Sequence, residues 1–377
     1  MNKDFNQSYW EIRRYFDTWD LVVIGAGIVG LSTALSYRRL KPKSKILVLE
    51  RGTWSQGAST KNAGFACFGT IGELLDDLSK DPSGQSVWET VRLRWEGLKL
   101  LRKRLGDKAI DFRPYGGYEL FKGHSEFEQA QEHLEFFNRQ MKEVTGIRQC
   151  FDVAPVFRGL KGFRAMIRNS HEAQLNSGAM MLALEQLTRK HGIEILNGLN
   201  VLNIKDQNNF VDIETPYGLF KANSLVVATN GFANQLLQGL DLKPARAQVL
   251  VTSVIPSLKL RGAFHLDRGY YYFRNIDQRI LLGGGRNLDP KTEECDAFGL
   301  NNLIHQELDN LLQNHILPAH PYTIAQRWSG IMGMGHGKKP ILKWTSQNVL
   351  AVVRMGGMGI AIGSKIADMA ATELSKK

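Results

Sequence analysis

Three glycines and one glutamate have the types and spacing of a site for nucleotide phosphates. Gly25, Gly27 and Gly30 form a G-x-G-x-x-G loop, and Glu50 follows twenty residues after Gly30. Gly25 permits a tight turn, Gly27 lets the backbone approach a pyrophosphate, and Gly30 lets a helix pack closely on a strand. An acid at the position of Glu50 accepts hydrogen bonds from ribose hydroxyls, which argues against NADP and its 2′-phosphate.

The segments around these residues have the patterns of elements that would hold them in place. Residues 21–24 (LVVI) form a short apolar run, as expected of a buried parallel strand. Residues 31–40 have helical spacing, and residues 45–50 form a second apolar run that ends in Glu50. A helix that begins at the glycine loop offers N–H groups and its positive dipole end to phosphates. The pattern predicts a βαβ dinucleotide-binding unit.

The residues after Glu50 distinguish between two dinucleotide cofactors. A NAD-binding domain usually continues directly into its next helix, whereas residues 51–65 form a long segment rich in Gly, Ser and Ala. Small side chains let the backbone pass close to a flat ligand, and its N–H groups can meet phosphate or ring acceptors. This segment favours FAD over NAD.

Eight short segments resemble, in order, those of the D-amino-acid oxidase superfamily of FAD-dependent oxidoreductases, which includes glycine oxidase, sarcosine oxidase and γ-glutamylputrescine oxidase. The segments are 23–27 (VIGAG), 49–52 (LERG), 58–64 (ASTKNAG), 225–231 (LVVATNG), 244–248 (PARAQ), 271–274 (YYFR) with 280–285 (ILLGGG), 328–332 (WSGIM) and 356–360 (GGMGI). Ala247 stands where the family motif has glycine. The resemblance implies that 328–332 and 356–360 are loops that contact the flavin.

The fingerprint and the resemblance together predict where FAD binds. Residues 349–353 form an apolar strand before the second glycine loop, and a helix is expected over 364–374. That helix N-terminus can face the pyrimidine edge of a reduced flavin. The expected FAD-binding residues are Gly25, Gly27, Ile28, Gly30, Glu50, Arg51, Ser59, Asn62, Ala63, Gly64, Val201, Ala228, Thr229, Asn230, Gly330, Gly356, Gly357, Met358, Gly359 and Ile360.

The resemblance also implies an α/β fold of two domains. We expect a Rossmann-like FAD-binding domain that is discontinuous in sequence, built from residues 1–85, 160–240 and 325–377. A substrate domain with a mostly antiparallel sheet would take residues 86–159 and 241–324. The active site would lie between the domains, at the carboxyl ends of the parallel strands.

Candidate catalytic residues are those in segments expected to face the substrate. We select Lys61, Tyr271, His336 and Arg354; His265 and Tyr272 are further candidates, and each of these aromatic residues could equally be core. Arg246 could also supply a positive charge to a substrate, although phosphate contact or solvation is an equally available role for these cations.

Three departures from the family affect the expected chemistry. Met332 is at the position where relatives that oxidise amino acids carry an arginine for the substrate carboxylate. Leu281 is at about the position where sarcosine-type relatives carry an oxygen-activating lysine. Residues 296–377 contain no cysteine for a covalent flavin link, so we expect non-covalent FAD. Substrate and electron acceptor are therefore open at this stage.

The leading hypothesis is an oxidoreductase that dehydrogenates a C–N bond of a small-molecule amine or N-substituted amino acid by hydride transfer to flavin N5. The alternatives are a 2-hydroxy acid or alcohol dehydrogenase of the same fold, a tRNA-modifying flavoprotein and a flavin-binding protein without catalysis. The net charge of +11 permits an anionic partner. Residues 87–105 form a helical pattern with several basic residues, but no RNA-binding module accompanies it, so a nucleic-acid partner is not expected.

Composition and cysteine usage set the remaining limits. A chain of 377 residues with 43% hydrophobic and 23% charged residues is typical of a globular protein. Cys67, Cys150 and Cys295 are far apart, so no disulfide framework or metal site is expected and a reducing compartment is favoured. The first twenty residues lack the apolar stretch of a signal peptide, and 21–37 is too polar for a membrane span. We expect a cytoplasmic protein with no membrane partner.

Overall fold

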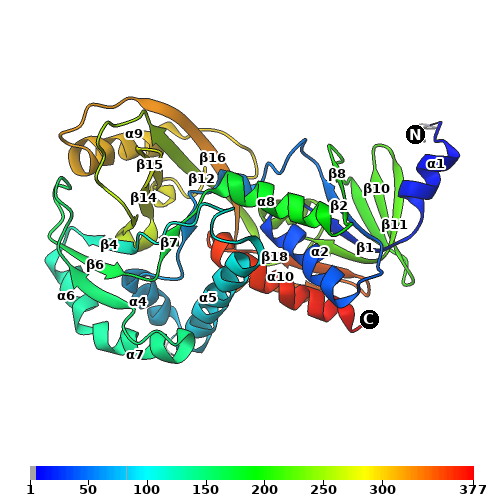
Figure 1. Ribbon diagram of the computed structural model, residues 1–377, viewed down its shortest axis with the longest axis horizontal. Helices are drawn as coiled ribbons and strands as arrows, with labels where there is room; N and C mark the ends of the chain where they lie inside the picture. Colours follow the sequence, from blue (N-terminus) through cyan, green and yellow to red (C-terminus); the bar gives the residue numbers. More distant parts are fainter. Residues whose placement is uncertain (1–5, 82) are drawn as a thin grey trace.

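The apolar runs on either side of the first glycine loop become neighbouring parallel strands of a mixed sheet in the computed structural model of the chain (Figure 1). The structure describes residues 6–81 and 83–377. Residues 1–5 lie outside the described residues; they are part of the first expected domain segment and of the region searched for a signal peptide. The first sheet has the order β17-β18-β11-β1-β2-β8. Its strands are β1 (Trp19–Ile24), β2 (Ile46–Glu50), β8 (Glu194–Asn197), β11 (Gly218–Val227), β17 (Ile341–Trp344) and β18 (Val349–Val353).

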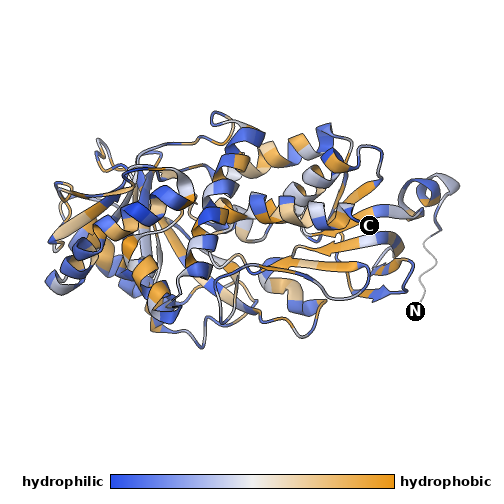
Figure 2. Cartoon of the chain, turned by 90° about the horizontal axis from the view of Figure 1, so that it is seen from below, coloured by the Kyte–Doolittle hydropathy of each residue, from blue (hydrophilic) through white to orange (hydrophobic). Residues whose placement is uncertain are grey.

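Alternate residues of these strands enter two different hydrophobic clusters. Leu21 and Val23 of β1 face the helices, whereas Val22 and Ile24 face a hairpin formed by β9 (Asn203–Asp206) and β10 (Val211–Thr215), which pairs with β11. Both faces of the sheet are covered, which explains why the strand sequences are apolar at consecutive positions. Figure 2 shows these strands as largely hydrophobic ribbons.

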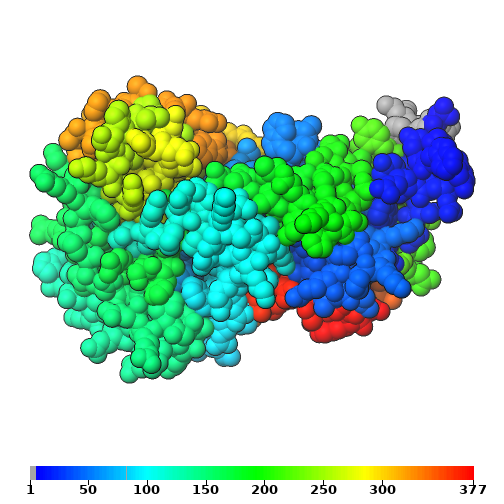
Figure 3. All heavy atoms as spheres, in the orientation of Figure 1, coloured from blue at the N-terminus to red at the C-terminus, as the bar shows by residue number. Residues whose placement is uncertain are grey.

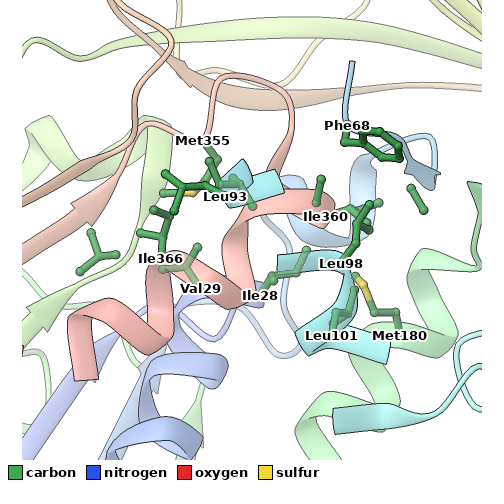
Figure 4. Packing of buried hydrophobic residues seen from close by; sticks show 14 of the residues in the cluster. Ile28, Val29, Phe68, Leu93, Leu98, Leu101, Met180, Met355, Ile360 and Ile366 are labelled. Carbon is green, nitrogen blue, oxygen red and sulfur yellow. The ribbon is translucent and has the colours of Figure 1, made fainter. Parts of the chain in front are cut away.

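Three helices pack together against the first sheet and bring the two glycine loops close to each other. They are α2 (Ile28–Leu40), α5 (Gln85–Leu105) and α10 (Gly359–Ser375), and α8 (Ser177–Lys190) lies beside α2. In Figure 4, Ile28 and Val29 at the start of α2 lie close to Met355, Ile360 and Ile366 from the chain around the start of α10. The helix N-termini are thus fixed by core packing.

The second sheet is antiparallel except for one pair, β13 with β4. Its order is β16-β12-β15-β14-β13-β4-β6-β5. The strands are β4 (Gly117–Phe121), β5 (Phe151–Ala154), β6 (Ala165–Asn169), β12 (Lys243–Thr252), β13 (Ala263–Leu266), β14 (Tyr271–Ile276), β15 (Arg279–Gly284) and β16 (Ile324–Met334). In Figure 1 this sheet occupies the left half of the molecule and the first sheet the right half.

Helices and short segments complete the described chain. Helix α9 (Asn302–Leu311) and η5 (Leu312–Ile316) share a hydrophobic cluster with the second sheet, and α4 (Ile71–Lys80), α6 (His124–Glu132) and α7 (Leu134–Thr145) lie near its other end. The short elements are α1 (Tyr9–Glu11), η1 (Ile12–Phe16), α3 (Ala58–Lys61), β3 (Phe65–Ala66), β7 (Ala173–Gln174), η2 (Asn230–Gln235), η3 (Asp267–Gly269) and η4 (Arg286–Leu288). Figure 3 shows the surface narrowing between the two halves. Among the described residues, no helix is long and apolar enough to cross a bilayer.

Several expectations about single elements need correction. Segment 328–332 is not a loop but lies inside strand β16, because it pairs with β12 over its whole length. The helix expected from residue 31 begins at Ile28, and the one expected from 364 begins at Gly359, since the glycine loops end directly in helices.

The predicted division into two domains is not decided by these elements and stays a prediction. The strands follow a slightly different grouping from the predicted segments: 165–169 and 324–334 belong to the second sheet. Helix α5, placed in the substrate domain by the prediction, packs on α10 next to the first sheet.

Candidate functional site

A cavity of about 770 Å³ lies where the two sheets meet. It is lined on one side by Ile24 and Glu50 at the carboxyl ends of β1 and β2, and on the other by Val249 and Tyr272 of the second sheet. Small-molecule sites of this size are usual at such positions in α/β proteins. The predicted location of the active site therefore coincides with this cavity.

The first glycine loop has the geometry that its sequence predicts. Gly25 has φ +102°, a conformation that residues with a side chain rarely adopt. A Cβ atom on Gly30 would lie 1.9 Å from the carbonyl oxygen of Gly25, so only glycine permits this packing of α2 on the loop. Gly30 does not line the cavity, and its role is therefore structural.

Ser59 and Glu50 hold the loop in place from outside. Ser59 Oγ accepts a hydrogen bond from the Ile28 N–H at 3.0 Å. The carboxylate of Glu50 accepts one bond from the Ala26 N–H and one from the Gly52 N–H, each at 3.0 Å. Glu50 thus ties the glycine loop to the segment after β2, and its expected contact with a ribose stays a prediction.

The second glycine loop leads directly into α10. Gly356 and Gly357 have φ +55° and +79°, so both need the conformational freedom of glycine. The first N–H groups of α10 at Gly359 and Ile360, which lack partners within a helix, lie at the wall of the cavity. Two helix N-termini therefore face one cavity, which suits a ligand that carries negative charge at two places.

The residues around the cavity fit a dinucleotide of the FAD type. The hydroxyl of Thr229 is buried without a hydrogen-bond partner among the described residues and lines the cavity, as expected of a group that a ligand would satisfy. All predicted FAD-binding residues other than Gly30 line the cavity: Gly25, Gly27, Ile28, Glu50, Arg51, Ser59, Asn62, Ala63, Gly64, Val201, Ala228, Thr229, Asn230, Gly330, Gly356, Gly357, Met358, Gly359 and Ile360.

The four predicted catalytic residues are not brought together. Lys61 and His336 line the cavity. Tyr271 does not: it belongs to the hydrophobic cluster under α9, because side chains alternate along β14 and the next residue, Tyr272, faces the cavity instead. Tyr272 therefore replaces Tyr271 as the candidate. Arg354 also lies outside the cavity lining.

Two of the cations considered for a substrate carboxylate are already paired. Arg246 binds the fully buried Glu293, with Nη2 to Oε1 at 2.8 Å. Arg354 pairs with Asp241, whose carboxylate also contacts His336 Nδ1 at 2.7 Å. The hydrogen bonds from His336 lower the pKa of Asp241, so this carboxylate stays ionised and keeps both partners. Neither arginine is therefore available to a ligand in this conformation.

Other cations at the cavity are less engaged. The ammonium group of Lys61 lies 4.8 Å from the centre of the Phe298 ring, a cation–π distance. Arg286, in η4 directly after the glycines of β15, also lines the cavity. Within residues 6–81 and 83–377, neither Lys61 nor Arg286 forms an ion pair. The sequence analysis did not select Arg286. Its position directly after Gly283–Gly285, which belong to one of the segments that resemble the family, could have indicated a cavity-lining residue.

An ion-pair network that the sequence did not predict lines part of the cavity, with Arg94 and Glu73 largely buried and Lys338 40% exposed. Arg94 of α5, only 3% exposed, binds Glu73 of α4 at 3.1 Å, and Lys338 contacts Glu73 at 3.0 Å and Asp77 at 2.7 Å. Burial opposes ionisation of Glu73, but the two cations outweigh it and lower its pKa to about 2. No local pattern marks Arg94, because its partner lies on another helix.

A second unpredicted group lies nearby and consists of Cys67, Glu172 and His265. Of these, the sequence analysis named His265 as a further substrate-facing candidate and considered Cys67 only as a cysteine far from the other two cysteines; it gave no sign of Glu172. The side chains of Cys67 and Glu172 are almost completely buried, and all three residues line the cavity.

Comparisons with known proteins agree with this geometry. A family model described as "DAO: FAD dependent oxidoreductase" matches residues 20–373. The chain is 22% identical over 374 residues to the probable oxidoreductase OrdL of Rhizobium meliloti (strain 1021), covering 92% of this chain and 80% of that protein. It is 21% identical over 321 residues to the glycine oxidase of Geobacillus kaustophilus (strain HTA426), covering 83% of this chain and 81% of that protein.

Solved structures share the fold at low sequence identity. The crystal structure of L-proline dehydrogenase from P. horikoshii has a TM-score of 0.76 at 16% identity, covering 96% of this chain and 94% of that chain. The glycine oxidase structure from Geobacillus kaustophilus has a TM-score of 0.73 at 16% identity, covering 95% of both chains.

Proposed function

Because the chain belongs to the DAO family of FAD-dependent oxidoreductases, we propose that it dehydrogenates a C–N bond of an amine or of an N-substituted amino acid. Bound FAD supplies the electron acceptor for this oxidation. The chain's own residues bind the substrate, orient its reacting carbon and exclude water. The observation that carries the proposal is the single cavity in which two helix N-termini meet a wall of aromatic and ionisable side chains.

The charges around the cavity support a restriction on the substrate. Met332 lines the cavity at the position where amino-acid-oxidising relatives are expected to carry an arginine. Arg246 and Arg354 are held by Glu293 and Asp241. A buried carboxylate is costly without a fixed cation. We therefore infer that glycine and D-alanine, whose carboxylate adjoins the reacting carbon, are not the preferred substrates.

An acidic group further from the amine is compatible with the site. Lys61 and Arg286 line the cavity and are free of ion pairs with described residues. An arginine can bind a carboxylate through two parallel hydrogen bonds. Arg286 is therefore the residue we propose to bind an acidic group that is remote from the C–N bond.

The experiment that tests the proposed function is anaerobic mixing of the purified holoenzyme with a substrate panel while the flavin absorption band is recorded. The panel contains amines, N-substituted amino acids, simple α-amino acids and 2-hydroxy acids. Bleaching by amines or N-substituted amino acids is the expected result. Bleaching by 2-hydroxy acids alone would assign the chain to C–O oxidation, and no bleaching by any member would contradict the proposal.

Two further expectations remain predictions beside this proposal. The cytoplasmic location depends on the cysteine pattern, and the non-covalent attachment of FAD depends on the lack of cysteine after residue 295. Acid precipitation of the protein tests the latter, because FAD should then appear in the supernatant.

A further inference from the structure

Three side chains from separate segments meet at the end of the cavity. Cys67 follows β3, Glu172 lies in the turn before β7, and His265 is on β13. Their thiol, carboxylate and imidazole atoms all lie within 4.8 Å of one another. All three residues line the cavity, and Oε2 of Glu172 also packs against Gly117 of β4.

Two of these side chains have unused hydrogen-bonding capacity. Glu172 Oε1 accepts bonds from the Phe68 N–H at 2.8 Å and the Gly69 N–H at 3.0 Å, which fix the carboxylate in place. Glu172 Oε2 and His265 Nε2 are buried and have no hydrogen-bond partner among the described residues. Buried polar atoms are normally paired, because leaving one unpaired costs about 1–3 kcal/mol. The two free atoms indicate a ligand that donates hydrogen bonds.

The surroundings favour a positively charged donor of limited size. The Phe65 ring makes edge contacts with His265 and Tyr272, at 5.1 and 5.5 Å between centroids, so the wall beside the two free atoms is aromatic. Burial lowers the pKa of His265 to about 4, so its imidazole is neutral and can accept a hydrogen bond. The titratable groups that influence Glu172, Cys67 or His265 are Glu73, Glu119 and Cys150, together with Arg274, a buried cation that lies near Cys67.

We propose that Glu172 and His265 form the subsite for the amino group of the substrate, which binds as an alkylammonium ion. This inference rests on the proposed function and adds the position of the amine. An ammonium group carries several N–H donors, which can bind Glu172 Oε2 and His265 Nε2 together. Its charge meets the carboxylate at a buried acceptor atom, where a charge-assisted bond is strong.

A metal ion is the other ligand that these residue types could hold. Zinc binds cysteine as the thiolate. Burial and the neighbouring Glu172 raise the pKa of Cys67 well above its usual range, so a zinc ion would have to displace the thiol proton, whereas an amine needs only the two free acceptors. The free acceptors therefore favour an amine over a metal.

The test measures binding of an amine that cannot be oxidised. tert-Butylammonium has no hydrogen on the carbon that carries nitrogen, so isothermal titration of the holoenzyme reports binding alone. Pivalate has a similar shape and the opposite charge, and tetramethylammonium is a cation without N–H donors. We expect tert-butylammonium to bind at least tenfold more tightly than either of these two probes.

Glu172→Gln is the central variant, because its amide oxygen can still accept the bonds from Phe68 and Gly69. It should weaken tert-butylammonium at least tenfold, and His265→Asn serves as a second variant if Glu172→Gln does not fold. Glu119→Gln is the matched control: Glu119 is also a buried carboxylate whose pKa burial raises to about 7, but it binds the Gly72 N–H and does not line the cavity. Because the carboxylates of Glu119 and Glu172 repel each other, this control should bind tert-butylammonium no more weakly than the wild type.

Each other outcome has a defined meaning. The subsite is refuted if the wild type does not bind tert-butylammonium or binds pivalate equally well. It is also refuted if Glu172→Gln and His265→Asn both bind tert-butylammonium as tightly as the wild type. Stoichiometric zinc that is retained by the wild type and lost in Cys67→Ser would assign the cluster to a metal instead. If Glu172-dependent binding is found but no amine bleaches the flavin, the subsite stands and the proposed function fails.

Discussion

At the residue scale, chemistry that depends on backbone shape was predictable and chemistry that depends on distant partners was not. The structural roles of Gly25 and Gly357 could be predicted from the sequence because only glycine adopts their conformations readily. Arg246 looked available in the sequence, yet its partner Glu293 lies 47 residues further along the chain. Tyr271 and Tyr272 point to opposite faces of β14, and their residue types alone do not show which of the two faces the cavity.

Met332 should determine how the site treats a carboxylate next to the reacting carbon. We expect wild-type kcat/KM for glycine and D-alanine to be lower than for larger amines and N-substituted amino acids, because no free cation lies at this position. Met332→Arg should improve kcat/KM for D-alanine, whereas Met332→Leu should not. If glycine or D-alanine leads the wild-type panel and Met332→Arg brings no gain, another cation such as Arg286 already binds the carboxylate.

Glu172 should make amine binding dependent on pH. Burial raises the pKa of Glu172 to about 7, so the carboxyl group is neutral at lower pH and negative at higher pH. Its neighbour Glu73 stays ionised throughout, and His265 stays neutral. The affinity for tert-butylammonium should therefore rise from pH 6 to pH 8 and then level off, as measured by titration calorimetry.

The variants separate this effect from other titrations. Glu172→Gln should remove the rise, and Glu119→Gln should keep it although Glu119 titrates in the same range. A rise that persists in Glu172→Gln would show that a different group controls binding.

Leu281 should make oxygen a poor electron acceptor. Its side chain is buried in an apolar cluster with Ala63 and Val249, so it offers no charge beside the cavity. A fixed cation stabilises the superoxide that forms when oxygen takes an electron. Stopped-flow reoxidation of the reduced protein in air-saturated buffer should be slower than turnover with a dye acceptor. Leu281→Lys should speed reoxidation and Leu281→Met should not; equal rates with oxygen and dye in the wild type would refute this view.

At the scale of elements, periodicity located the βαβ unit and the family resemblance located segments 271–274 and 280–285, which pair as β14 and β15, but several connections were misjudged. Residues 126–144 have one helical pattern, yet the chain forms α6 and α7 with a break at His133. Segment 112–121 forms a strand only over Gly117–Phe121. Segment 328–332 contains glycine, as loops do, but its pairing with β12 decides its structure. Such tertiary pairing leaves no local pattern in sequence.

Glu293 should be essential for the stability of the second sheet around β12, which lies between the edge strand β16 and β15. This fully buried carboxylate accepts bonds from Arg246, Gln248 and Asn301, and so joins β12 to the segment before α9. Glu293→Ala leaves Arg246 nearly buried without a counter-charge, which typically costs about 3–5 kcal/mol. The neighbouring Glu294→Ala, which removes only a half-exposed pair with Lys243, should cost under about 1 kcal/mol. Urea denaturation compares the two, and similar losses would contradict the argument.

At the scale of the molecule, the order of motifs was the strongest source of prediction. The resemblance runs from residue 23 to residue 360 and agrees with a family match over 20–373. What it could not supply is the grouping of segments: β6 and β16 join the second sheet, and α5 joins the helices of the first. These choices depend on the summed packing of surfaces that are far apart in sequence.

The cavity draws its wall from both sheets, which leads to a prediction for the whole molecule. Gly27 lies in the loop between β1 and α2 and Glu50 ends β2, whereas Ala247 and Tyr272 belong to the second sheet. A ligand that reaches only the first group stabilises only that part, whereas FAD is expected to contact both. A ligand at a thousand times its Kd adds about 4 kcal/mol to stability, which corresponds to roughly 5 °C in Tm for a chain of 377 residues.

Calorimetry of the deflavinated protein tests this argument with FAD and ADP at the same concentration. We expect FAD to raise the Tm of the main transition by roughly 5 °C, and ADP to raise it less because it lacks the part that would reach the second sheet and therefore binds more weakly. Gly27→Val should abolish both shifts and yield colourless protein, because a branched side chain would meet Ser59 and fill the space of the pyrophosphate. Gly178→Ala, where the added Cβ meets only Asn176 at 3.4 Å, should behave like the wild type. Equal shifts with ADP and FAD would mean that the second sheet gains nothing from the flavin, and the cavity would then not couple the two halves of the molecule.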